Sequence, residues 1–586
     1  MGIKALCVPL SHGLMADPGH GGPAAAGAEN TVAYKMSLKR LFDADRCTRI
    51  ELAAKFVNKI TTRAYYLLKL YYLTHVQPVF LADRQAFATR PFTRTEWTIK
   101  MALTIVQNSR HHFRGGTSDP EDVVIEGRLA ALWLPYGAIG QQGDDRMSLS
   151  KAFQYQSVTI RTAVLNNVRQ RFARHVGAYI GFALRPIIAQ HANVALYDAL
   201  PRAEKIEWSK EIHRAIDDVM FHRIGALRLT QRAFVREWVE AKRWSIVPCL
   251  RAGLDAGRKS VFFDLSDRRN RRPFVYLPYM VYMNVQMAAA GQLKLLTPFP
   301  MRRGFIPAHF GMCTNAMIDL LADRTDLVAF RATFLATHGI ALRIESTADL
   351  GKSFAQLADL PASTPLQQET YMDALWEYFA PKLCGRQLKH LLLPRPGEAR
   401  LVGKMKLAHF IVTDGYSVSI LATDAAVRGS KVYGANAGDA PDDATDPLVP
   451  TITVANAHTY AAGLLAVDKR LVSADPGKGE LMTLIAEPYG KVVRYSAKQR
   501  RNETGRLTRA KARRKVQCSP LVAPLSPEFP AAAVGGMPWT PRRVENQIIQ
   551  GIRPRTCILD EYADAMMTLV RLEGPMLTAY AGRMFR

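Results

Sequence analysis

The residue with the clearest chemical potential is Asp475, which follows a short apolar stretch at residues 471–474 and precedes a glycine-containing turn. Two further apolar stretches, at residues 481–486 and 492–495, predict a second and a third strand. A carboxylate at the end of such a first strand can hold a divalent cation, because Mg²⁺ takes oxygen ligands and often uses one or two carboxylates. The same Asp-Pro-Gly tripeptide at residues 17–19 has no strands around it, so the flanking strands, and not the tripeptide, make Asp475 a metal-ligand candidate.

A dense basic strip begins on the third of these strands and continues beyond it. Between Lys491 and Lys515 the only acidic residue is Glu503. The basic residues of the strip are Lys491, Arg494, Lys498, Arg500, Arg501, Arg506, Arg509, Lys511, Arg513, Arg514 and Lys515. Each phosphate that such a residue neutralises releases counterions, so the strip predicts strong, salt-sensitive and sequence-independent binding of nucleic acid. Residues 511–515 (KARRK) also match a nuclear-localisation pattern, which predicts the nucleus as the location.

The composition of the whole chain favours the same kind of partner. The 586 residues include 78 Lys and Arg against 51 Asp and Glu, a net charge of +27. Phosphate backbones are the commonest partner of so basic a protein, and an inert basic surface is the alternative. The longest apolar segment, residues 276–290, is interrupted by Asn284 and Gln286, which predicts a buried segment and no membrane partner. The seven cysteines form no CxxC pair, so the sequence predicts no zinc site.

The elements that must position these residues are mainly helical up to residue 385. A three- and four-residue apolar spacing predicts one amphipathic helix with the face Leu52, Phe56, Ile60, Ala64, Leu67 and Tyr71. Its other face carries Lys55, Lys59 and Arg63, either as a phosphate-facing stripe or as a solvated face. A second helix is predicted to begin at Asn166-Asn167, to bury Val168, Phe172, Val176 and Ile180, and to end near Arg185-Pro186.

Beyond residue 385 the pattern changes to strands. Residues 407–413 and 416–422 are joined by Asp414-Gly415, which predicts a β-hairpin. A helix is predicted at residues 457–469, and six prolines between Pro520 and Pro541 predict an irregular connection. The chain closes on a helix with the face Ile558, Tyr562, Met566, Leu569 and Leu572, which we expect to break at Gly574-Pro575 and resume.

Four motifs in a fixed order suggest a family. They are WEYF at residues 376–379, TDGYSVS at 413–419, ADPG at 474–477 and RYSAKQRR at 494–501, the last followed by Glu503 and Gly505. In this order and spacing the chain resembles the Fanzor family, the eukaryotic relatives of TnpB, which are transposon-associated RNA-guided DNA endonucleases. The matched motifs lie between Trp376 and Lys515, and the helical N-terminal half is compatible with them.

The resemblance implies a multidomain α+β fold. Residues 1–33 would be a disordered tail, 34–385 a large helical recognition lobe and 386–456 a small β-rich, wedge-like domain. Residues 457–586 would be the N-terminal part of an RNase-H-like (RuvC) α/β domain, with the basic segment and the closing helices. The implied partners are guide RNA and target DNA, bound by a monomeric protein in a ribonucleoprotein. The implied catalytic residue is Asp475, as a ligand of Mg²⁺.

The chain departs from the family after Asp475. The second and third RuvC acids and the zinc module with its Cys pairs are expected there, and neither is identifiable. Asp560-Glu561 follows an apolar run, but the periodicity onward to Leu572 predicts a helix and not a strand-end acid. The sequence therefore predicts a C-terminally truncated member. Three hypotheses remain: a nuclease that takes its missing acids from elsewhere, a non-catalytic guide-RNA- and DNA-binding remnant, or an unrelated basic scaffold.

Overall fold

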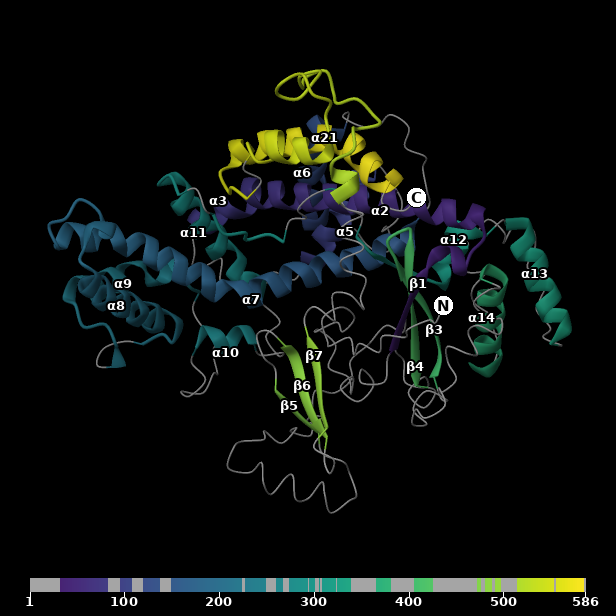
Figure 1. Cartoon of the computed structure of the whole chain (residues 1–586), viewed down its shortest axis with the longest axis horizontal. Helices are drawn as coiled ribbons and strands as arrows, with labels where there is room; N and C mark the ends of the chain where they lie inside the picture. Colours follow the sequence, from purple (N-terminus) through teal and green to yellow (C-terminus); the bar gives the residue numbers. More distant parts are fainter. Residues whose placement is uncertain are drawn as a thin grey trace, which may run out of the picture.

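The computed structural model shows a mainly helical body with two small antiparallel sheets, an α+β protein (Figure 1). It describes residues 32–82, 95–107, 120–137, 149–223, 227–248, 260–266, 273–292, 295–300, 305, 308–322, 324–338, 365–380, 405–424, 472–475, 480–486, 491–496, 514–552 and 555–583. Of the predicted tail at residues 1–33, residues 1–31 lie outside these ranges, as does the predicted helix at 457–469. The prediction is wrong for Val32 and Ala33, because they are the first residues of strand β1 (Val32–Ser37).

Helix α2 (Ala44–Tyr71) lies at the centre of the helical body and confirms the first predicted helix. It begins where the Asp43 side chain accepts a hydrogen bond from the Arg46 backbone N–H (2.8 Å), and it continues through a π turn (Tyr72–Val76) into α3 (Gln77–Ala82). The predicted apolar face is buried at Ile60, Ala64, Leu67 and Tyr71, but Leu52 is exposed. The predicted polar opposite face is wrong, because α2 is buried on most of its circumference from Val57 onward. α2 is therefore a core helix rather than a surface helix.

Four further helices enclose α2: α5 (Thr95–Val106), α6 (Pro120–Gly137), α7 (Ser150–His191) and α21 (Leu559–Arg583). The predicted start of a helix at Asn166-Asn167 is wrong, because α7 runs through both residues. Asn167 is buried and its side chain donates to the Pro298 carbonyl (2.5 Å), so this amide serves a neighbouring segment and not a helix end. The predicted end near Pro186 is also wrong. Pro186 is exposed, and Leu184 and Ile188 anchor the helix on both sides of it.

Helix α21 runs along α2 at the top of Figure 1. The predicted apolar face is confirmed, because Tyr562, Met566, Leu569 and Leu572 are all buried. The predicted break at Gly574-Pro575 is wrong, because α21 continues through both residues. Leu572 before the proline and Met576 after it are fully buried, so packing on both sides offsets the lost backbone hydrogen bond.

The remaining helices lie at the two ends of the body. At one end are α8 (Arg202–Met220), α9 (Ala233–Ile246), α10 (Val261–Ser266) and α11 (Leu277–Ala289), and at the other are α12 (Thr314–Leu321), α13 (Arg324–Thr337) and α14 (Pro365–Phe379) (Figure 1). The predicted buried segment at 276–290 is confirmed, and its Asn284 donates to the Leu296 carbonyl (2.6 Å). Among the described helices, none has the length and apolar character needed to cross a membrane.

A four-stranded antiparallel sheet takes its strands from three parts of the chain. Its order is β1 (Val32–Ser37), β4 (Ser417–Asp424), β3 (Met405–Thr413) and β2 (Phe310–Cys313). The predicted hairpin is confirmed as β3–β4. Its two outer neighbours come from residues 32–37 and 310–313, which lie outside the range 386–456 assigned to the β-rich domain. Long-range pairing thus joins the hairpin to the helical body.

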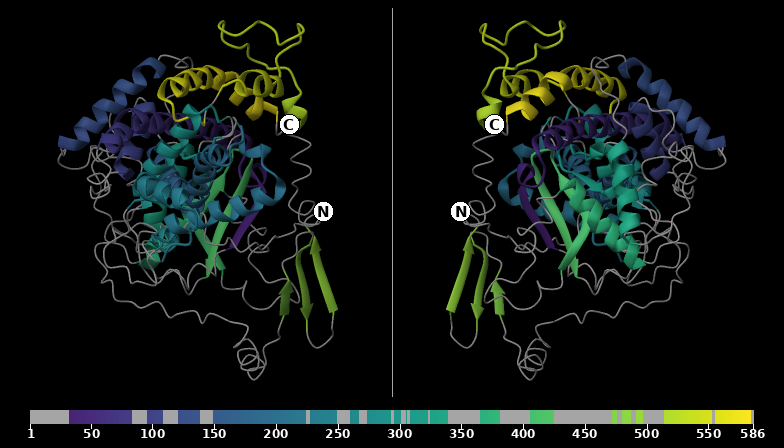
Figure 2. Two further views of the ribbon diagram at one scale, coloured as in Figure 1. Left: turned by 90° about the vertical axis from the view of Figure 1, so that its left-hand side faces the viewer. Right: turned by 90° about the vertical axis from the view of Figure 1, so that its right-hand side faces the viewer.

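The second sheet consists of β5 (Val472–Asp475), β6 (Glu480–Ala486) and β7 (Lys491–Ser496). All three predicted strands are confirmed, and they pair antiparallel in the order β5-β6-β7. This sheet stands apart from the four-stranded sheet (Figure 2). The predicted proline-rich connection is also confirmed, since residues 520–540 are largely irregular and α20 (Pro541–Arg543) begins at a Thr540 N-cap.

Candidate nucleic-acid interface

Asp475 is the last residue of β5, as the sequence predicts. In the register of the sheet it lies opposite Thr483 of β6, and Thr483 lies opposite Arg494 of β7. One cross-strand row therefore joins the candidate metal ligand to a residue of the basic strip. Within the described part of the chain, no three His, Cys, Asp or Glu residues lie together as a metal site would require.

The basic strip lies only partly within the described residues. Lys491 and Arg494 are on β7, and Arg514 and Lys515 are exposed in a helical turn at residues 514–517. The remaining members lie outside the described residues: Lys498, Arg500, Arg501, Arg506, Arg509, Lys511 and Arg513. The strip therefore begins on strand β7 and ends in the helical turn at residues 514–517.

In the predicted stripe on α2, Arg63 is not available to a phosphate. Arg63 is only 4% exposed, and its Nε donates to a Glu573 carboxylate oxygen of α21 at 2.6 Å. Lys55 is half-buried and pairs with Glu51 one turn earlier (3.2 Å), and Lys59 is also half-buried. The i, i+4 spacing is real, but α21 covers the face on which Arg63 lies. Arg63 therefore stabilises the α2–α21 interface instead of presenting its charge to a ligand, and Lys55 forms its ion pair within α2.

A second enclosed cation lies two turns further along α2. Lys69 is buried, its Nζ donates to the Thr556 carbonyl (2.6 Å), and it lies 4.0 Å from the centre of the Tyr562 ring. Burial lowers the pKa of Lys69 to about 8 and raises the pKa of the neighbouring Cys557 thiol to about 11. Two basic residues, Arg63 and Lys69, are therefore buried between α2 and the C-terminal segment that contains α21.

The TDGYSVS motif is a structural turn. The Asp414 carboxylate accepts hydrogen bonds from the backbone N–H groups of Tyr416 (3.1 Å) and Ser417 (2.8 Å), which closes the β3–β4 hairpin. Gly415 has φ +90°, and a Cβ there would lie 2.9 Å from the Cβ of Ala54. The Tyr416 hydroxyl donates to Glu51 of α2 (2.9 Å). Burial and Glu51 together raise the pKa of Tyr416, so the hydroxyl remains a donor and holds the hairpin against α2.

The WEYF motif is also structural. Trp376 and Phe379 are buried, and the Trp376 indole N–H donates to the Thr314 hydroxyl at 2.9 Å. The Phe379 carbonyl accepts from the Arg46 guanidinium (3.0 Å). Two of the four motifs therefore join α14 and the hairpin to the helical body.

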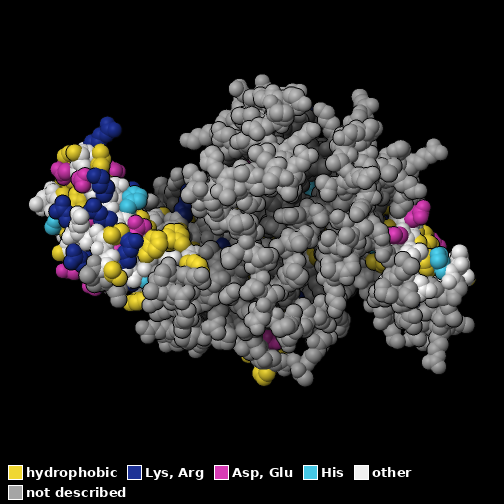
Figure 3. Space-filling view, turned by 90° about the horizontal axis from the view of Figure 1, so that it is seen from below, with side chains coloured by type: hydrophobic (Ala, Val, Ile, Leu, Met, Phe, Trp, Pro, Cys, Tyr) yellow, Lys and Arg dark blue, Asp and Glu magenta, His cyan; other side chains and the backbone are white. Residues whose placement is uncertain are grey.

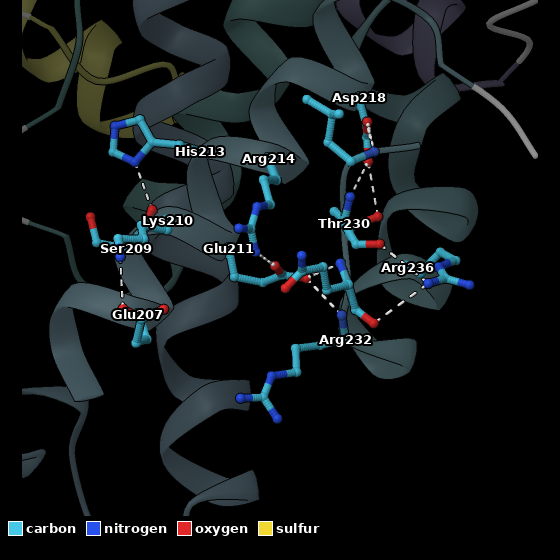
Figure 4. Close-up of polar contacts among 12 residues, drawn as sticks. Glu207, Ser209, Lys210, Glu211, His213, Arg214, Asp218, Thr230, Arg232 and Arg236 are labelled. Atoms are coloured by element: carbon cyan, nitrogen blue, oxygen red, sulfur yellow. Dashed lines mark hydrogen bonds and ion pairs between the residues drawn. The ribbon is translucent and has the colours of Figure 1, made fainter. Parts of the chain in front are cut away.

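The α8–α9 hairpin presents a charged surface that the sequence reasoning missed. Its acidic residues are used internally: the buried Glu211 accepts from the backbone N–H groups of Gln231 (2.6 Å) and Arg232 (2.8 Å) at the start of α9. The buried Asp218 accepts from the Thr230 N–H (3.0 Å) and hydroxyl (2.9 Å) (Figure 4). These carboxylates hold the loop at residues 229–232 that leads into α9, and Glu211 places a negative charge beside the positive end of that helix.

Basic side chains occupy the outer face of the same hairpin. Lys210 is exposed and lies beside Arg214, His213 and Ile206 in a shallow surface depression. At the surface, Lys210 lowers the pKa of Glu207 and Arg228 lowers the pKa of Glu240 through direct hydrogen bonds. Arg232, directly before α9, and Arg236 and Lys242 of α9 are also exposed. Burial of the Glu211 and Asp218 carboxylates leaves more basic than acidic side chains on the exposed surface of the hairpin. A sequence pattern that places both acids on one face of α8 could have indicated this surface.

No family model and no curated protein matches the chain.

Proposed function

We propose that this chain is an RNA-guided DNA-binding protein of the Fanzor kind. The observation that carries the proposal is the order of features along the chain. Asp475 ends β5, an antiparallel β5-β6-β7 sheet follows, and a strip of basic residues begins on β7 and runs to Lys515. An RNase-H-like domain begins with the same arrangement of strands and carboxylate. The net charge of +27 supports a polyanionic partner.

In this proposal the protein and the guide RNA have different roles in binding DNA. The basic strip binds phosphate groups without reading bases, so sequence recognition belongs to pairing between guide RNA and target DNA. A nuclear location and a monomeric protein within a ribonucleoprotein are part of the same proposal. An unrelated basic scaffold is the competing hypothesis, and it predicts no retained RNA.

Asp475 is the one candidate ligand for Mg²⁺ in this proposal. When bound at such a site, Mg²⁺ can activate water and stabilise the leaving oxygen of a phosphodiester. The described residues contain no three-residue group of metal-ligating side chains, so we derive no cleavage step. The function supported best by the chain's own residues is binding.

Retention of RNA tests the binding proposal. We expect the full chain to purify with RNA at low salt, and the logarithm of its affinity to fall linearly with the logarithm of salt concentration. Replacing four strip residues by Gln should reduce that slope by about three, since each phosphate contact contributes about 0.7–0.9. The four residues are Arg500, Arg501, Arg514 and Lys515.

A charge-matched variant controls for non-specific effects. Lys39, Arg40, Arg202 and Arg542 are exposed basic residues outside the strip, and the same change to Gln there should leave most of the slope intact. Equal slopes for both variants, or a wild-type chain that retains no RNA, would support the scaffold hypothesis instead.

A cleavage assay distinguishes a nuclease from a binding remnant. The purified ribonucleoprotein is incubated with DNA complementary to its own RNA, with Mg²⁺ or with a chelator, and compared with Asp475→Asn. Cleavage by the wild type that this variant abolishes supports the enzyme. Asp198→Asn, an exposed carboxylate after α7, is the matched control. Binding without cleavage in every sample supports the remnant.

A further inference from the structure

Three aromatic side chains from three different elements gather at the C-terminal end of α8. Phe221 follows α8 and is 38% exposed, Trp244 near the end of α9 is 48% exposed, and Phe262 of α10 is 46% exposed. The ring centres of Phe221 and Phe262 are 5.6 Å apart. Large aromatic rings normally bury most of their surface, so a group of half-exposed rings indicates an interaction surface.

Two arginines lie against these rings. The Arg223 guanidinium lies 5.0 Å from the centre of the Phe221 ring, and the Arg243 guanidinium lies 5.5 Å from that of Trp244. Arg243 is only 4% exposed, and one of its Nη atoms donates to the Asp218 carbonyl (3.1 Å). Among the described residues, the Nε of Arg243 and the Nη1 of Arg223 are buried and have no hydrogen-bond partner. We name these five residues, Phe221, Arg223, Arg243, Trp244 and Phe262, the aromatic–arginine cluster.

The backbone at the end of α8 holds the cluster in place. The Arg223 N–H donates to the Asp218 carbonyl (2.9 Å) and the His222 N–H to the Val219 carbonyl (3.3 Å), a Schellman ending with His222 at φ +50°. The Asp218 carbonyl therefore anchors both arginines of the cluster. The Asp218 carboxylate accepts from Leu229 and Thr230, which joins the same point to the loop before α9 (Figure 4). Because these contacts form within the chain, the surface is organised before any ligand binds.

We infer that the aromatic–arginine cluster stacks unpaired bases of a single-stranded nucleic acid on its exposed rings, with the partly exposed Arg223 beside the phosphates. Bases stack on aromatic rings whatever their sequence, and arginines beside the rings supply the matching positive charge. Hydrophobic and basic side chains lie interspersed on this end of the molecule (Figure 3). The inference rests on the proposed function, because it assigns part of the nucleic-acid contact to a surface distant in sequence from the basic strip.

Equilibrium binding of fluorescent oligouridylate and oligothymidylate to the full chain tests the inference. We expect Trp244→Ala and Phe221→Ala each to weaken single-strand binding about 5- to 150-fold, the range expected for losing one stacked base. Trp244→Phe should retain most of the affinity, and Trp244→Leu, which keeps apolar surface without a π face, should not. The RNA and DNA arms show which strand the cluster prefers, and an effect in either arm supports the inference.

Two controls keep the outcome specific. Leu134→Ala removes a 78% exposed apolar side chain from α6 and should leave binding unchanged. The salt dependence of Trp244→Ala should equal that of the wild type, because no phosphate contact is lost. Binding to a duplex, whose bases are already stacked, should not change.

The possible failures are distinguishable. If the wild type binds single strands and Trp244→Ala binds equally well, the cluster inference is overturned and the proposed function stands. If Trp244→Leu matches the wild type while Trp244→Ala does not, the surface recognises an apolar partner and the inference is again overturned. If the wild type binds no nucleic acid, both the inference and the proposed function fail.

Discussion

Two buried arginines show how differently one residue type is used in this molecule. Arg63 and Arg243 are each 4% exposed, and each lies within 6 Å of the centre of a tryptophan ring, at 5.9 Å and 5.5 Å respectively. Arg63 is paired with Glu573 at 2.6 Å, and its neighbour Trp133 is buried. Arg243 contacts a backbone carbonyl, and its neighbour Trp244 is half-exposed.

This difference in partners indicates which of the two arginine sites is still open to a ligand. A buried cation loses its hydration, and a carboxylate at hydrogen-bond distance replaces most of what is lost. The donors of Arg63 are directed to such a partner, so the α2–α21 interface is closed to ligands. Arg243 lies beside the half-exposed Trp244 ring and the partly exposed Arg223 lies beside the half-exposed Phe221 ring, so the aromatic–arginine cluster keeps the accessible rings and the positive charge that the proposed contact needs.

The largest expected effect on stability comes from breaking the buried Arg63–Glu573 ion pair, which we call the closed pair. Glu573→Ala leaves the Arg63 charge buried without compensation and should lower the free energy of unfolding by about 3–5 kcal/mol, measured by urea denaturation. Glu528→Ala is the control, because its pair with Arg571 (3.5 Å) is on the surface and should contribute less than about 1 kcal/mol. Equal losses in the two variants would show that the α2–α21 interface is not closed around Arg63.

The next effect tests how tightly the β3–β4 hairpin is held on α2. Gly415→Ala places a Cβ 2.9 Å from that of Ala54 at φ +90°, so we expect a loss of about 2–4 kcal/mol from backbone strain and crowding together. Gly291 has φ +78° with open space around it, and Gly291→Ala should cost only the backbone part, about 1 kcal/mol. Similar losses in both, measured by thermal unfolding, would remove the contact with α2 from the explanation.

Two histidines, His175 in the core and His222 beside the aromatic–arginine cluster, make the free energy of unfolding depend on pH. Burial lowers the pKa of His175 in α7 to about 4, and burial together with Arg243 lowers the pKa of His222 to about 4. Between pH 6.5 and 4 the unfolded chain binds protons that the folded chain does not, so stability is full above pH 6.5 and falls as the pH is lowered. At pH 5 we expect a loss of about 1–2 kcal/mol from His175 and less from the half-buried His222.

Single variants separate the two contributions. His175→Gln should flatten the loss of stability between pH 6.5 and 4 more than His222→Asn, in which Asn keeps the left-handed backbone favourable. The measurement is the urea midpoint across this pH range, with the exposed His213→Gln as control. An unchanged pH dependence in His175→Gln would contradict the prediction.

The smallest expected effect on stability is at the cluster itself. Trp244→Ala removes a half-exposed ring and should lower the free energy of unfolding by less than about 1 kcal/mol. Trp376→Ala removes a fully enclosed ring and its hydrogen bond to Thr314, for which about 3–5 kcal/mol is expected. A loss at Trp244 as large as at Trp376, measured by thermal unfolding, would make Trp244 a core residue and weaken the case for a binding surface.

Local patterns predicted many elements correctly. The helical periodicity around Ile60 and Tyr562, the Asp414-Gly415 turn and the three strands around Asp475 are all present in the structure. The predicted helix boundaries at Asn167, Pro186 and Pro575 are wrong for one reason. Burial of side chains on both sides of each position outweighs the local preference to begin or end a helix there.

The sequence by itself determined the charge, the type of most elements and the run of basic residues that follows Asp475, because these depend on composition and near-neighbour spacing. Only the tertiary structure decided which cations are enclosed and which aromatic rings remain exposed. Arg63 is closed off by Glu573, 510 positions away, and Phe221 meets Phe262 from a different helix. Burial is decided by such distant partners, so neither the closed pair nor the aromatic–arginine cluster is visible in local sequence.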